Sequence, residues 1–244
     1  MATNNQIEGK RAVYEAYLAD VPISSLKIAN NIQKDSLVNK IISLSKQKGV
    51  TPIFCDNSEI KKLSNTQSSQ GIIAIAKQYK YASIPDIMTV CENKEVSLVV
   101  LCDHITDTHN FGAIIRSAES VGASGIIIPN ARSVEVNSTV YKTSAGAALH
   151  VNIACVPNLA RAISVFKASG FWVCAATEHA DLPIWDANLQ GKIVLVLGNE
   201  EKGISDNLLK NCDFAACLPQ MGHISSLNVA QASTVFMYEW LRQN

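Results

Sequence analysis

Two loops near the C-terminal end of the chain carry polar side chains at positions where they could hold a ligand. Residues 198–203 (Gly-Asn-Glu-Glu-Lys-Gly) follow the uninterrupted apolar run 193–197, and residues 218–229 end in Ser-Leu-Asn-Val. In open α/β sheets, ligands bind at loops that follow strands. Carboxylate and amide groups there suit an uncharged or cationic ligand. A tight turn with solvated charges explains the first loop equally well when it is considered alone.

The loop 198–203 does not match the glycine-rich loops that bind nucleotide phosphates. Its two glycines have the spacing of the phosphate-binding loop of nucleoside triphosphatases, but Ile204 stands where that motif needs lysine. The chain also contains no Gly-x-Gly-x-x-Gly sequence, the pattern that dinucleotide-binding folds use. Both nucleotide-binding classes are therefore excluded by the sequence.

A third segment, residues 107–118, contains the pattern Asn-x-Gly-x-x-x-Arg through Asn110 and Arg116. This segment resembles the first motif of the SpoU (TrmH-like) RNA ribose methyltransferases of the SPOUT superfamily. The loop 198–203 is similar to their second motif, and residues 219–229 are similar to their third. Residues 70–74 (Gln-Gly-Ile-Ile-Ala) end an N-terminal part that resembles the substrate-binding domain of the bacterial 23S ribosomal RNA guanosine 2'-O-methyltransferases.

The resemblance implies an enzyme that transfers a methyl group from S-adenosylmethionine to a ribose 2'-hydroxyl, with a guanosine of 23S ribosomal RNA as the expected substrate. Transfer RNA is the alternative substrate. A catalytically silent RNA-binding or ribosome-assembly protein with the same fold is the alternative from another class. The resemblance also implies a homodimer formed through the C-terminal region and no metal, because the positive sulfur already makes the methyl group electrophilic.

Five side chains would carry the chemistry that the resemblance implies: Asn110, Arg116, Glu200, Ser226 and Asn228. Arg116 is the family's proposed catalytic residue, acting as a base assisted by the RNA phosphate or as a group that positions phosphate and sugar. Asn110 would hold Arg116 or the ribose, and Glu200 would anchor Arg116 or the RNA. Ser226 and Asn228 would orient the ribose.

The same side chains also have purely structural interpretations. Asn110 would cap the helix that follows it, and Glu200 would be a solvated glutamate in the first turn of a helix. Ser225 or Ser226 would cap the last helix, which would place Asn228 in its first turn.

For the methyl donor, the resemblance implies a cradle of apolar walls and backbone groups. Apolar side chains suit stacking on adenine, and backbone N–H and C=O groups suit its edge. The matched residues are Thr177, Leu197, Gly198, Leu218, Met221, Gly222 and Leu227. Glu201 and Gln220 differ from the residues that are common at their positions in the family.

The composition indicates a globular protein that stays in a reducing compartment. The chain has 244 residues, of which 48% are hydrophobic, enough for one large core or two modest ones. Its start lacks the apolar core of a signal peptide, and no run approaches the roughly 18 apolar residues of a membrane span, so we expect a cytoplasmic protein without a membrane partner. The seven cysteines are scattered singly without a Cys-x-x-Cys pair, which indicates free thiols and no zinc site.

Charge is distributed unevenly along the chain although the net charge is zero. Residues 1–85 hold 11 Lys and Arg against 6 Asp and Glu, and residues 86–244 hold 10 against 15. A basic N-terminal part would attract RNA phosphates, and ordinary surface lysines are the alternative explanation. Two tyrosines of the expected linker, Tyr79 and Tyr81, would stack on bases or pack against a neighbouring domain.

Hydrophobic periodicity divides the chain into a small α/β domain (residues 1–78), a linker (79–94) and a larger α/β domain (95–244). In the first, helices are predicted at 9–19 and 35–48, with Asp35 as a cap, and strands at 26–29, 51–55 and 72–76. In the second, apolar strands alternate with helices, which predicts a mostly parallel sheet covered on both faces. These strands are expected at 98–102, 125–128, 151–156, 171–176, 193–197 and 215–218.

Three further expectations concern the larger domain. Knots are almost absent from proteins, so an unknotted sheet is the default, whereas the resemblance implies a SPOUT-type trefoil knot. A helix that begins near Asn110 would bury one apolar face and point Arg116 away from it. The closing helix, residues 227–242, has an apolar surface wide enough to pack on the sheet and on a second subunit.

Overall fold

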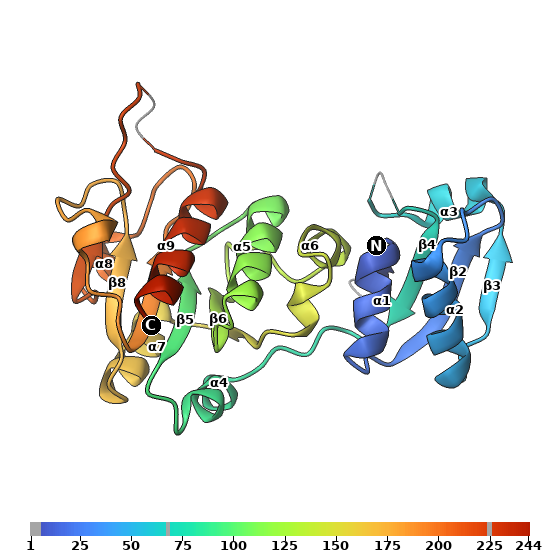
Figure 1. Ribbon diagram of the computed structural model, residues 1–244, viewed down its shortest axis with the longest axis horizontal. Coiled ribbons are helices and arrows are strands. Elements are labelled where there is room, and N and C mark those ends of the chain that lie inside the picture. Colours follow the sequence, from blue (N-terminus) through green and yellow to red (C-terminus); the bar gives the residue numbers. More distant parts are fainter. Residues whose placement is uncertain (1–5, 67–68, 224–225) are drawn as a thin grey trace. The chain divides into compact units, whose positions relative to one another are not determined.

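The computed structural model describes residues 6–66, 69–223 and 226–244. Two compact units make up the chain (Figure 1). The N-terminal unit consists of Met1–Lys80 together with Glu135–His150, and the C-terminal unit consists of Tyr81–Val134 together with Val151–Asn244. The N-terminal unit therefore contains a segment that comes from the middle of the sequence.

A mixed sheet with the strand order β1-β4-β2-β3 forms the centre of the N-terminal unit. Strand β4 pairs antiparallel with β1 and with β2, whereas β2 and β3 are parallel. Asp35 caps α2 as predicted, because its carboxylate accepts a hydrogen bond of 2.9 Å from the N–H of Val38. The elements of this unit are β1 (Gln6–Glu8), α1 (Lys10–Leu18), β2 (Ile23–Ala29), α2 (Ser36–Gln47), β3 (Pro52–Cys55), α3 (Asn57–Leu63) and β4 (Ile72–Ala76).

The segment Glu135–His150 adds α6 (Ser138–Thr143) and the short 3-10 helix η1 (Ala147–Leu149) to the N-terminal unit. Gly146 has a φ of 90°, and a Cβ atom at this position would lie 2.5 Å from Cβ of Glu15, so only glycine allows α1 to approach. Tyr79 donates a hydrogen bond of 3.3 Å to the carbonyl of Ala148 and packs edge-to-face on Tyr141. Tyr79 thus packs within its own unit rather than against a neighbouring domain, and stacking on a base stays a prediction.

The C-terminal unit is built on a sheet with the strand order β10-β8-β9-β5-β6-β7, in which each pair of neighbouring strands is parallel. The predicted mostly parallel sheet is confirmed. Continuous apolar runs form strands of this kind because both faces of the sheet are buried. The strands are β5 (Ser97–Cys102), β6 (Gly125–Pro129), β7 (Ile153–Val156), β8 (Trp172–Ala176), β9 (Lys192–Leu197) and β10 (Phe214–Ala216).

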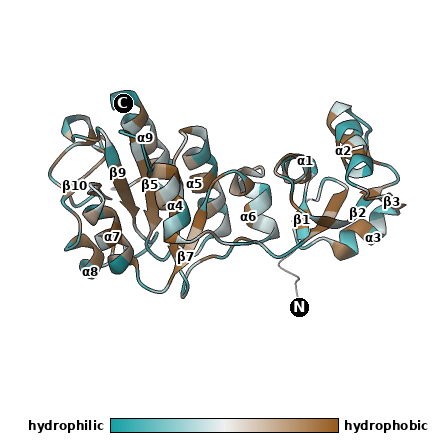
Figure 2. Cartoon of the chain, turned by 90° about the horizontal axis from the view of Figure 1, so that it is seen from below, coloured by the Kyte–Doolittle hydropathy of each residue, from teal (hydrophilic) through white to brown (hydrophobic). Residues whose placement is uncertain are grey.

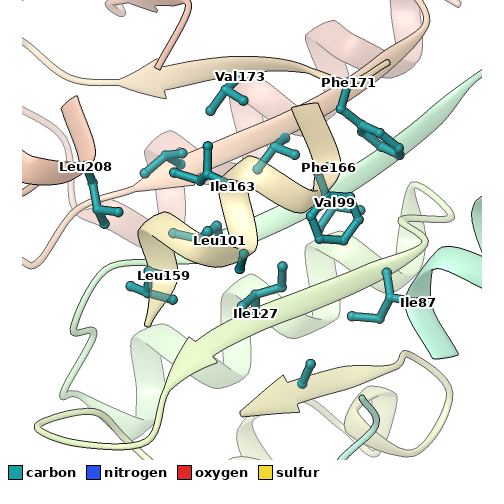
Figure 3. Packing of buried hydrophobic residues seen from close by; sticks show 14 of the residues in the cluster. Ile87, Val99, Leu101, Ile127, Leu159, Ile163, Phe166, Phe171, Val173 and Leu208 are labelled. Carbon is teal, nitrogen blue, oxygen red and sulfur yellow. The ribbon is translucent and has the colours of Figure 1, made fainter. Parts of the chain in front are cut away.

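Helices cover both faces of the C-terminal sheet. Figures 1 and 2 show α5 (Thr108–Ser120) and α9 (Val229–Gln243) on one face, with α4 (Ile84–Cys91), α7 (Leu159–Ala168) and α8 (Asp206–Leu209) on the other. On the second face, side chains of α7 pack on those of the central strands, and the rings of Phe166 and Phe171 meet edge-to-face at 5.1 Å (Figure 3). A further short 3-10 helix, η2, spans Ile184–Asp186.

Several local features differ from the sequence-based expectations. Strand β1 and helix α3 were not expected, since three and seven residues are too few to show a clear period. Residues 79–94 contain helix α4, which Ser83 and Asp86 stabilise by a reciprocal capping box. None of the helices in the described ranges is long and apolar enough to cross a membrane.

Candidate functional site

Helix α5 begins one turn before the position expected from Asn110. The carboxylate of Asp107 accepts hydrogen bonds from the N–H groups of His109 (2.7 Å) and Asn110 (2.8 Å), so Asp107 is the N-cap. The expectation that Asn110 caps this helix is therefore wrong. Because Asp107 satisfies the free N–H groups, the side-chain amide of Asn110 is left to bond elsewhere.

The loop after β9 is a closed turn that presents Glu200. The backbones of Asn199 and Gly203 exchange hydrogen bonds of 3.0 and 2.9 Å. The side-chain oxygen of Asn199 also accepts bonds from the N–H groups of Glu201 and Lys202. A Cβ atom on Gly198 would lie 2.4 Å from the carbonyl carbon of Gly203, so only glycine permits this closure.

Asparagine 228 is the N-cap of α9, and its side-chain oxygen accepts a hydrogen bond of 2.9 Å from the N–H of Ala230. The expectation that Asn228 lies in the first helical turn behind a serine cap is wrong. Ser226 lies two residues before the cap, and Ser225 lies outside the described residues. An asparagine cap is favoured as strongly as a serine cap, so residue type alone does not separate the candidates.

The three motif segments meet in one chain of side-chain hydrogen bonds. The amide nitrogen of Asn228 donates to the side-chain oxygen of Asn110 at 2.9 Å, and the amide nitrogen of Asn110 donates to Glu200 at 2.9 Å. The direction of this chain is fixed at both ends, because Ala230 offers an N–H donor and a carboxylate only accepts. Asn110 lies 90 residues from Glu200 and 118 residues from Asn228 in the sequence. The hydrogen bonds thus hold three distant side chains in a single orientation.

A cleft with a volume of about 930 Å³ opens beside this chain of hydrogen bonds, and Asn110, Glu200 and Asn228 all line it. Asp103, Asp107 and Glu200 accept hydrogen bonds within the cleft. Asp103 accepts from the N–H of Ser205 at 2.8 Å and contacts the His104 ring, and Asp107 caps α5. Burial, together with the negative charges of Glu200 and Asp103, raises the pKa of the Cys102 thiol to about 12.

Two smaller cavities of about 390 and 60 Å³ lie between the loop after β9, the end of β8 and the start of α9. They share the lining residues Ala176, Thr177, Glu178, Ser226, Leu227 and Ala232. Gly198 lines the larger cavity and Leu218 the smaller one. The structure thus brings together Thr177, Gly198, Leu218, Ser226 and Leu227.

Four of the residues singled out from the sequence lie away from these cavities. Leu197 is buried in β9, whereas Met221 is 98% exposed and Gly222 is exposed as well. Arg116 lies on the exposed face of α5, opposite Phe111, Ile114, Ile115 and Ala118, which are buried as predicted. Its side chain lines none of the three cavities.

Among the residues of the cleft that sequence reasoning missed, three have distinctive features. Asn199 orders the loop and donates to the carbonyl of His104 at 2.8 Å. His104 and Arg132 line the cleft in the left-handed backbone region, with φ values of 57° and 54°. Such conformations are uncommon outside glycine and cluster at functional sites. Asn199 comes directly after the glycine that follows a buried strand. This position was the available sequence signal.

No group of three or more His, Cys, Asp or Glu side chains with a geometry that could hold a metal ion occurs in residues 6–66, 69–223 and 226–244.

Comparison with known families gives two matches that together span most of the chain. Residues 97–238 match the model of the SpoU rRNA Methylase family. Residues 6–82 match the model described as RNA 2'-O ribose methyltransferase substrate binding.

Comparison with individual proteins agrees with these matches. The chain is 35% identical over 243 residues to YacO of Bacillus subtilis (strain 168), provisionally named a TrmH family tRNA/rRNA methyltransferase, and the alignment covers 98% of this chain and 96% of YacO. An AdoMet-bound rRNA methyltransferase from Sinorhizobium meliloti superposes with a TM-score of 0.80 at 25% identity, covering 97% of this chain and 86% of that one. The SpoU methyltransferase AviRb from Streptomyces viridochromogenes, in complex with AdoMet, has the same fold, with a TM-score of 0.81 at 23% identity and coverage of 98% and 89%.

Proposed function

We propose, since the chain belongs to the SpoU rRNA methylase family, that it transfers a methyl group from S-adenosylmethionine to a ribose 2'-hydroxyl of an RNA. The observation that carries this proposal is the hydrogen-bonded chain of Asn110, Glu200 and Asn228 beside the cleft. A silent RNA-binding protein has no need to hold three polar side chains from three distant segments in one orientation. The protein is therefore an RNA-modifying enzyme rather than a binding module.

The two smaller cavities fit S-adenosylmethionine chemically. Leu218, Leu227 and Phe236 offer apolar surface for an adenine ring, and Thr177 and Glu178 offer polar groups beside it. The negative charge of Glu178 suits a ligand with cationic groups. Thr177, Gly198, Leu218 and Leu227 would hold the cofactor, whose positive sulfur supplies an electrophilic methyl group. Leu197, Met221 and Gly222 remain predicted contributors.

The residues of the cleft would orient the ribose. Each side-chain amide has two N–H donors, and Asn110 and Asn228 each use one donor within the hydrogen-bonded chain. The second donor of each is left for a ribose or phosphate oxygen. Holding the hydroxyl in line with the methyl group lowers the entropic part of the barrier. We place Ser226 beside the same ribose, because it lines both cofactor cavities.

We assign Arg116 to the RNA phosphate rather than to proton removal. Arginine side chains keep their positive charge in proteins, which suits a phosphate partner and not a base. Its exposed position on α5 leaves it accessible to a polyanion. The proton of the ribose hydroxyl would then leave to Glu200 or to water.

A guanosine of 23S ribosomal RNA is the substrate that we propose. The match of residues 6–82 to a substrate-binding domain of RNA 2'-O ribose methyltransferases supports an RNA substrate in general. Transfer RNA is the second candidate, because the name of YacO covers both classes of RNA. These RNAs also motivate the proposal of a cytoplasmic location.

We further propose that the protein acts as a homodimer through α9. This helix presents Tyr238 and Leu241 to solvent although its other face is already buried on the sheet. Exposed apolar side chains grouped on one helix are typical of an association surface. Sedimentation at micromolar concentration tests the proposal, and a clean monomer mass would contradict it.

The first experiment incubates the protein with labelled S-adenosylmethionine and with unmodified ribosomal and transfer RNAs, followed by digestion and mass spectrometry of the nucleosides. We expect label in 2'-O-methylguanosine from 23S RNA. Label on a base would contradict the ribose mechanism, and label in transfer RNA alone would select the second substrate.

A second experiment separates the enzyme from a binding protein. We expect Arg116→Ala to lose at least about tenfold in turnover with a smaller change in RNA binding, since one charge-assisted contact among many is removed. If Arg116→Ala has the same turnover as the wild type, Arg116 does not belong to the proposed site.

A further inference from the structure

A pocket with a volume of about 400 Å³ lies in the N-terminal unit, and none of the residues assigned to methyl transfer lines it. It opens where β2 ends and where the turn before β4 begins. Four side-chain amides line it, from Asn31, Gln33, Asn57 and Gln70. The remaining lining residues are Lys10, Ala29, Ile32 and Gly71.

The amides of this pocket are available to a ligand. Asn31, Gln33 and Asn57 are exposed, and their side chains make no hydrogen bond with any residue in the part of the chain that the structure describes. Gln70 accepts a bond of 2.9 Å from the N–H of Lys10 with its oxygen and keeps its NH₂ group. The ammonium of Lys10 is neutralised by Asp35 at 2.7 Å.

The pocket has a fixed shape. Gln70 and Gly71 both lie in the left-handed backbone region, with φ values of 54° and 77°. A Cβ atom on Gly71 would lie 3.3 Å from Cβ of Ala29 and 3.4 Å from Cδ1 of Ile32, which is tighter than ordinary packing. The turn is therefore held against the end of β2, with its glutamine in a backbone conformation that is uncommon outside glycine.

An aromatic platform lies one strand away from the pocket. Phe54 belongs to β3, an edge strand of the sheet (Figure 1), and is 46% exposed. The Lys34 ammonium lies 5.6 Å from the centre of the Phe54 ring. Lys34 directly follows Gln33 of the pocket, and Asn57 follows Phe54 by three residues, so short pieces of chain connect platform and pocket.

Together these groups have the chemistry of a site for unpaired RNA. Side-chain amides donate and accept at the same time, as the edges of nucleobases do. Bases stack on exposed aromatic rings, and a nearby lysine attracts the phosphate. A duplex hides the base edges and faces that these groups would contact, whereas an unpaired segment presents them.

We propose that the pocket, together with Phe54 and Lys34, binds a short unpaired segment of the RNA substrate. One base stacks on Phe54, and the edge of a neighbouring base bonds to the amides of Gln33 and Asn57. This site rests on the proposed function in that the RNA which it binds is the one to be methylated. It is a recognition site and takes no part in methyl transfer itself.

The test compares two neighbouring positions of β3 in the full chain. Phe54→Ala removes the platform, and Ile53→Ala removes a side chain of similar exposure (48%) that points to the other face of the strand. Binding is measured by fluorescence anisotropy with a labelled single-stranded RNA of about 12 nucleotides and with its duplex, both without S-adenosylmethionine. A double variant, Gln33→Ala with Asn57→Ala, tests the amides.

We expect Phe54→Ala to weaken single-strand binding about tenfold and Ile53→Ala to change it less than about twofold. The double amide variant should weaken it about fivefold. Ultraviolet cross-linking of the wild-type complex should attach RNA to the peptide that contains Phe54. Thermal unfolding of each variant provides the folding control.

Equal binding by all variants, equal losses in Phe54→Ala and Ile53→Ala, or equal affinity for single strand and duplex would each overturn the proposal. Its failure is distinguishable from failure of the proposed function, because methyl transfer by the wild-type protein is measured separately. Methyl transfer without a Phe54 effect rejects this site alone. A Phe54 effect without methyl transfer rejects the enzymatic function alone.

Discussion

The side-chain amides of the proposed catalytic site and those of the N-terminal pocket differ in how they are bonded. In the C-terminal unit, Asn110 and Asn228 bond to each other and to Glu200. In the N-terminal unit, the amides of Asn31 and Gln33 bond to no residue that the structure describes. Groups that are fixed in advance suit a reaction, where misplacement is costly. Groups that remain available suit recognition, where the partner supplies the missing bonds.

The two units also differ in charge. The N-terminal unit (residues 1–80 and 135–150) carries 12 Lys and Arg against 7 Asp and Glu, whereas the C-terminal unit (residues 81–134 and 151–244) carries 9 against 14. An acidic cleft attracts cationic groups and would repel bare phosphates, so a basic region elsewhere is needed to hold RNA. The charge difference therefore agrees with a division between chemistry and recognition.

The largest effect should follow from breaking the bonded amides. Asn110→Ala removes the side chain that links Asn228 to Glu200, and a small misplacement of reacting groups costs about 100-fold in rate. We expect turnover to fall by about this factor with RNA binding nearly unchanged, as single-turnover methyl transfer and anisotropy would measure. Asn31→Ala is the matched control, with turnover preserved at saturating RNA. A variant that changes only the KM for RNA would place Asn110 in recognition instead.

A smaller effect is expected from opening the loop that carries Glu200. In Gly198→Ala the new Cβ would lie 2.4 Å from the backbone of Gly203, so the loop has to move and its contribution to the cofactor cavity is lost. We expect the affinity for S-adenosylmethionine to fall at least about tenfold by calorimetry. Gly170→Ala, at a turn with a φ of 83° where a Cβ meets nothing within 4 Å, is the control for the loss of backbone freedom without a clash. Unchanged cofactor affinity would exclude the loop from the cofactor site.

A third prediction concerns a bonded polar group within the N-terminal unit itself. Glu8 is buried and accepts hydrogen bonds from Gln6, Ser64, Asn65 and Thr66. Glu8→Ala should lower the free energy of unfolding by about 1–3 kcal/mol, because it leaves buried donors without a partner. Chemical denaturation measures this value, and a loss below about 0.5 kcal/mol would show that water replaces the carboxylate.

The same carboxylate makes stability depend on pH. Burial acts to raise the pKa of Glu8, but the hydrogen bonds from Ser64, Thr66 and Asn65 outweigh it and leave the pKa below its ordinary value of 4.5. Because the folded state has the lower pKa, the stabilisation is present above pH 4.5 and is lost as the pH falls further. Melting curves of the wild type should decline in that range more steeply than those of Glu8→Gln. Parallel declines would contradict this assignment.

The smallest expected effect is on the salt dependence of RNA binding. Lys34→Ala removes one cation from the proposed recognition site, which should weaken binding about twofold and reduce the slope of log affinity against log salt by about one. Lys210→Ala removes an exposed cation of the C-terminal unit and should leave the slope unchanged. An unchanged slope for Lys34→Ala together with a reduced slope for Lys210→Ala would place the RNA on the C-terminal unit alone.

Much of the fold could be predicted from local patterns. Runs such as Ile193 to Leu197 are buried on both faces, and their lack of polar alternation shows this directly. Asp35 was recognised as a cap because its type and position are both favourable. Asp107 was missed because Asn110 is an equally favourable cap type, and only the backbone geometry separates the two. The trefoil knot stays a prediction from the family.

The candidate site was predictable only in part. The motif resemblance identified Asn110, Glu200 and Asn228, yet nothing in their spacing indicates that they bond to one another, because this depends on packing between segments 90 and 118 residues apart. Gln70 and Gly71 of the N-terminal pocket lie in a segment that the resemblance identified, but Gln33 and Asn57 gave no sequence signal. Single polar residues in loops are common, and only the turn at Gln70 brings them to one cavity.

The segment Glu135–His150 constrains how the two units of such a protein can evolve. Its side chains Val140 and Tyr141 are buried within the N-terminal unit, although the chain on either side of it belongs to the sheet of the C-terminal unit. A single genetic crossover that replaced residues 1–80 would separate this segment from the surface that covers it. The two units are therefore expected to be exchanged, duplicated or lost together rather than as independent modules.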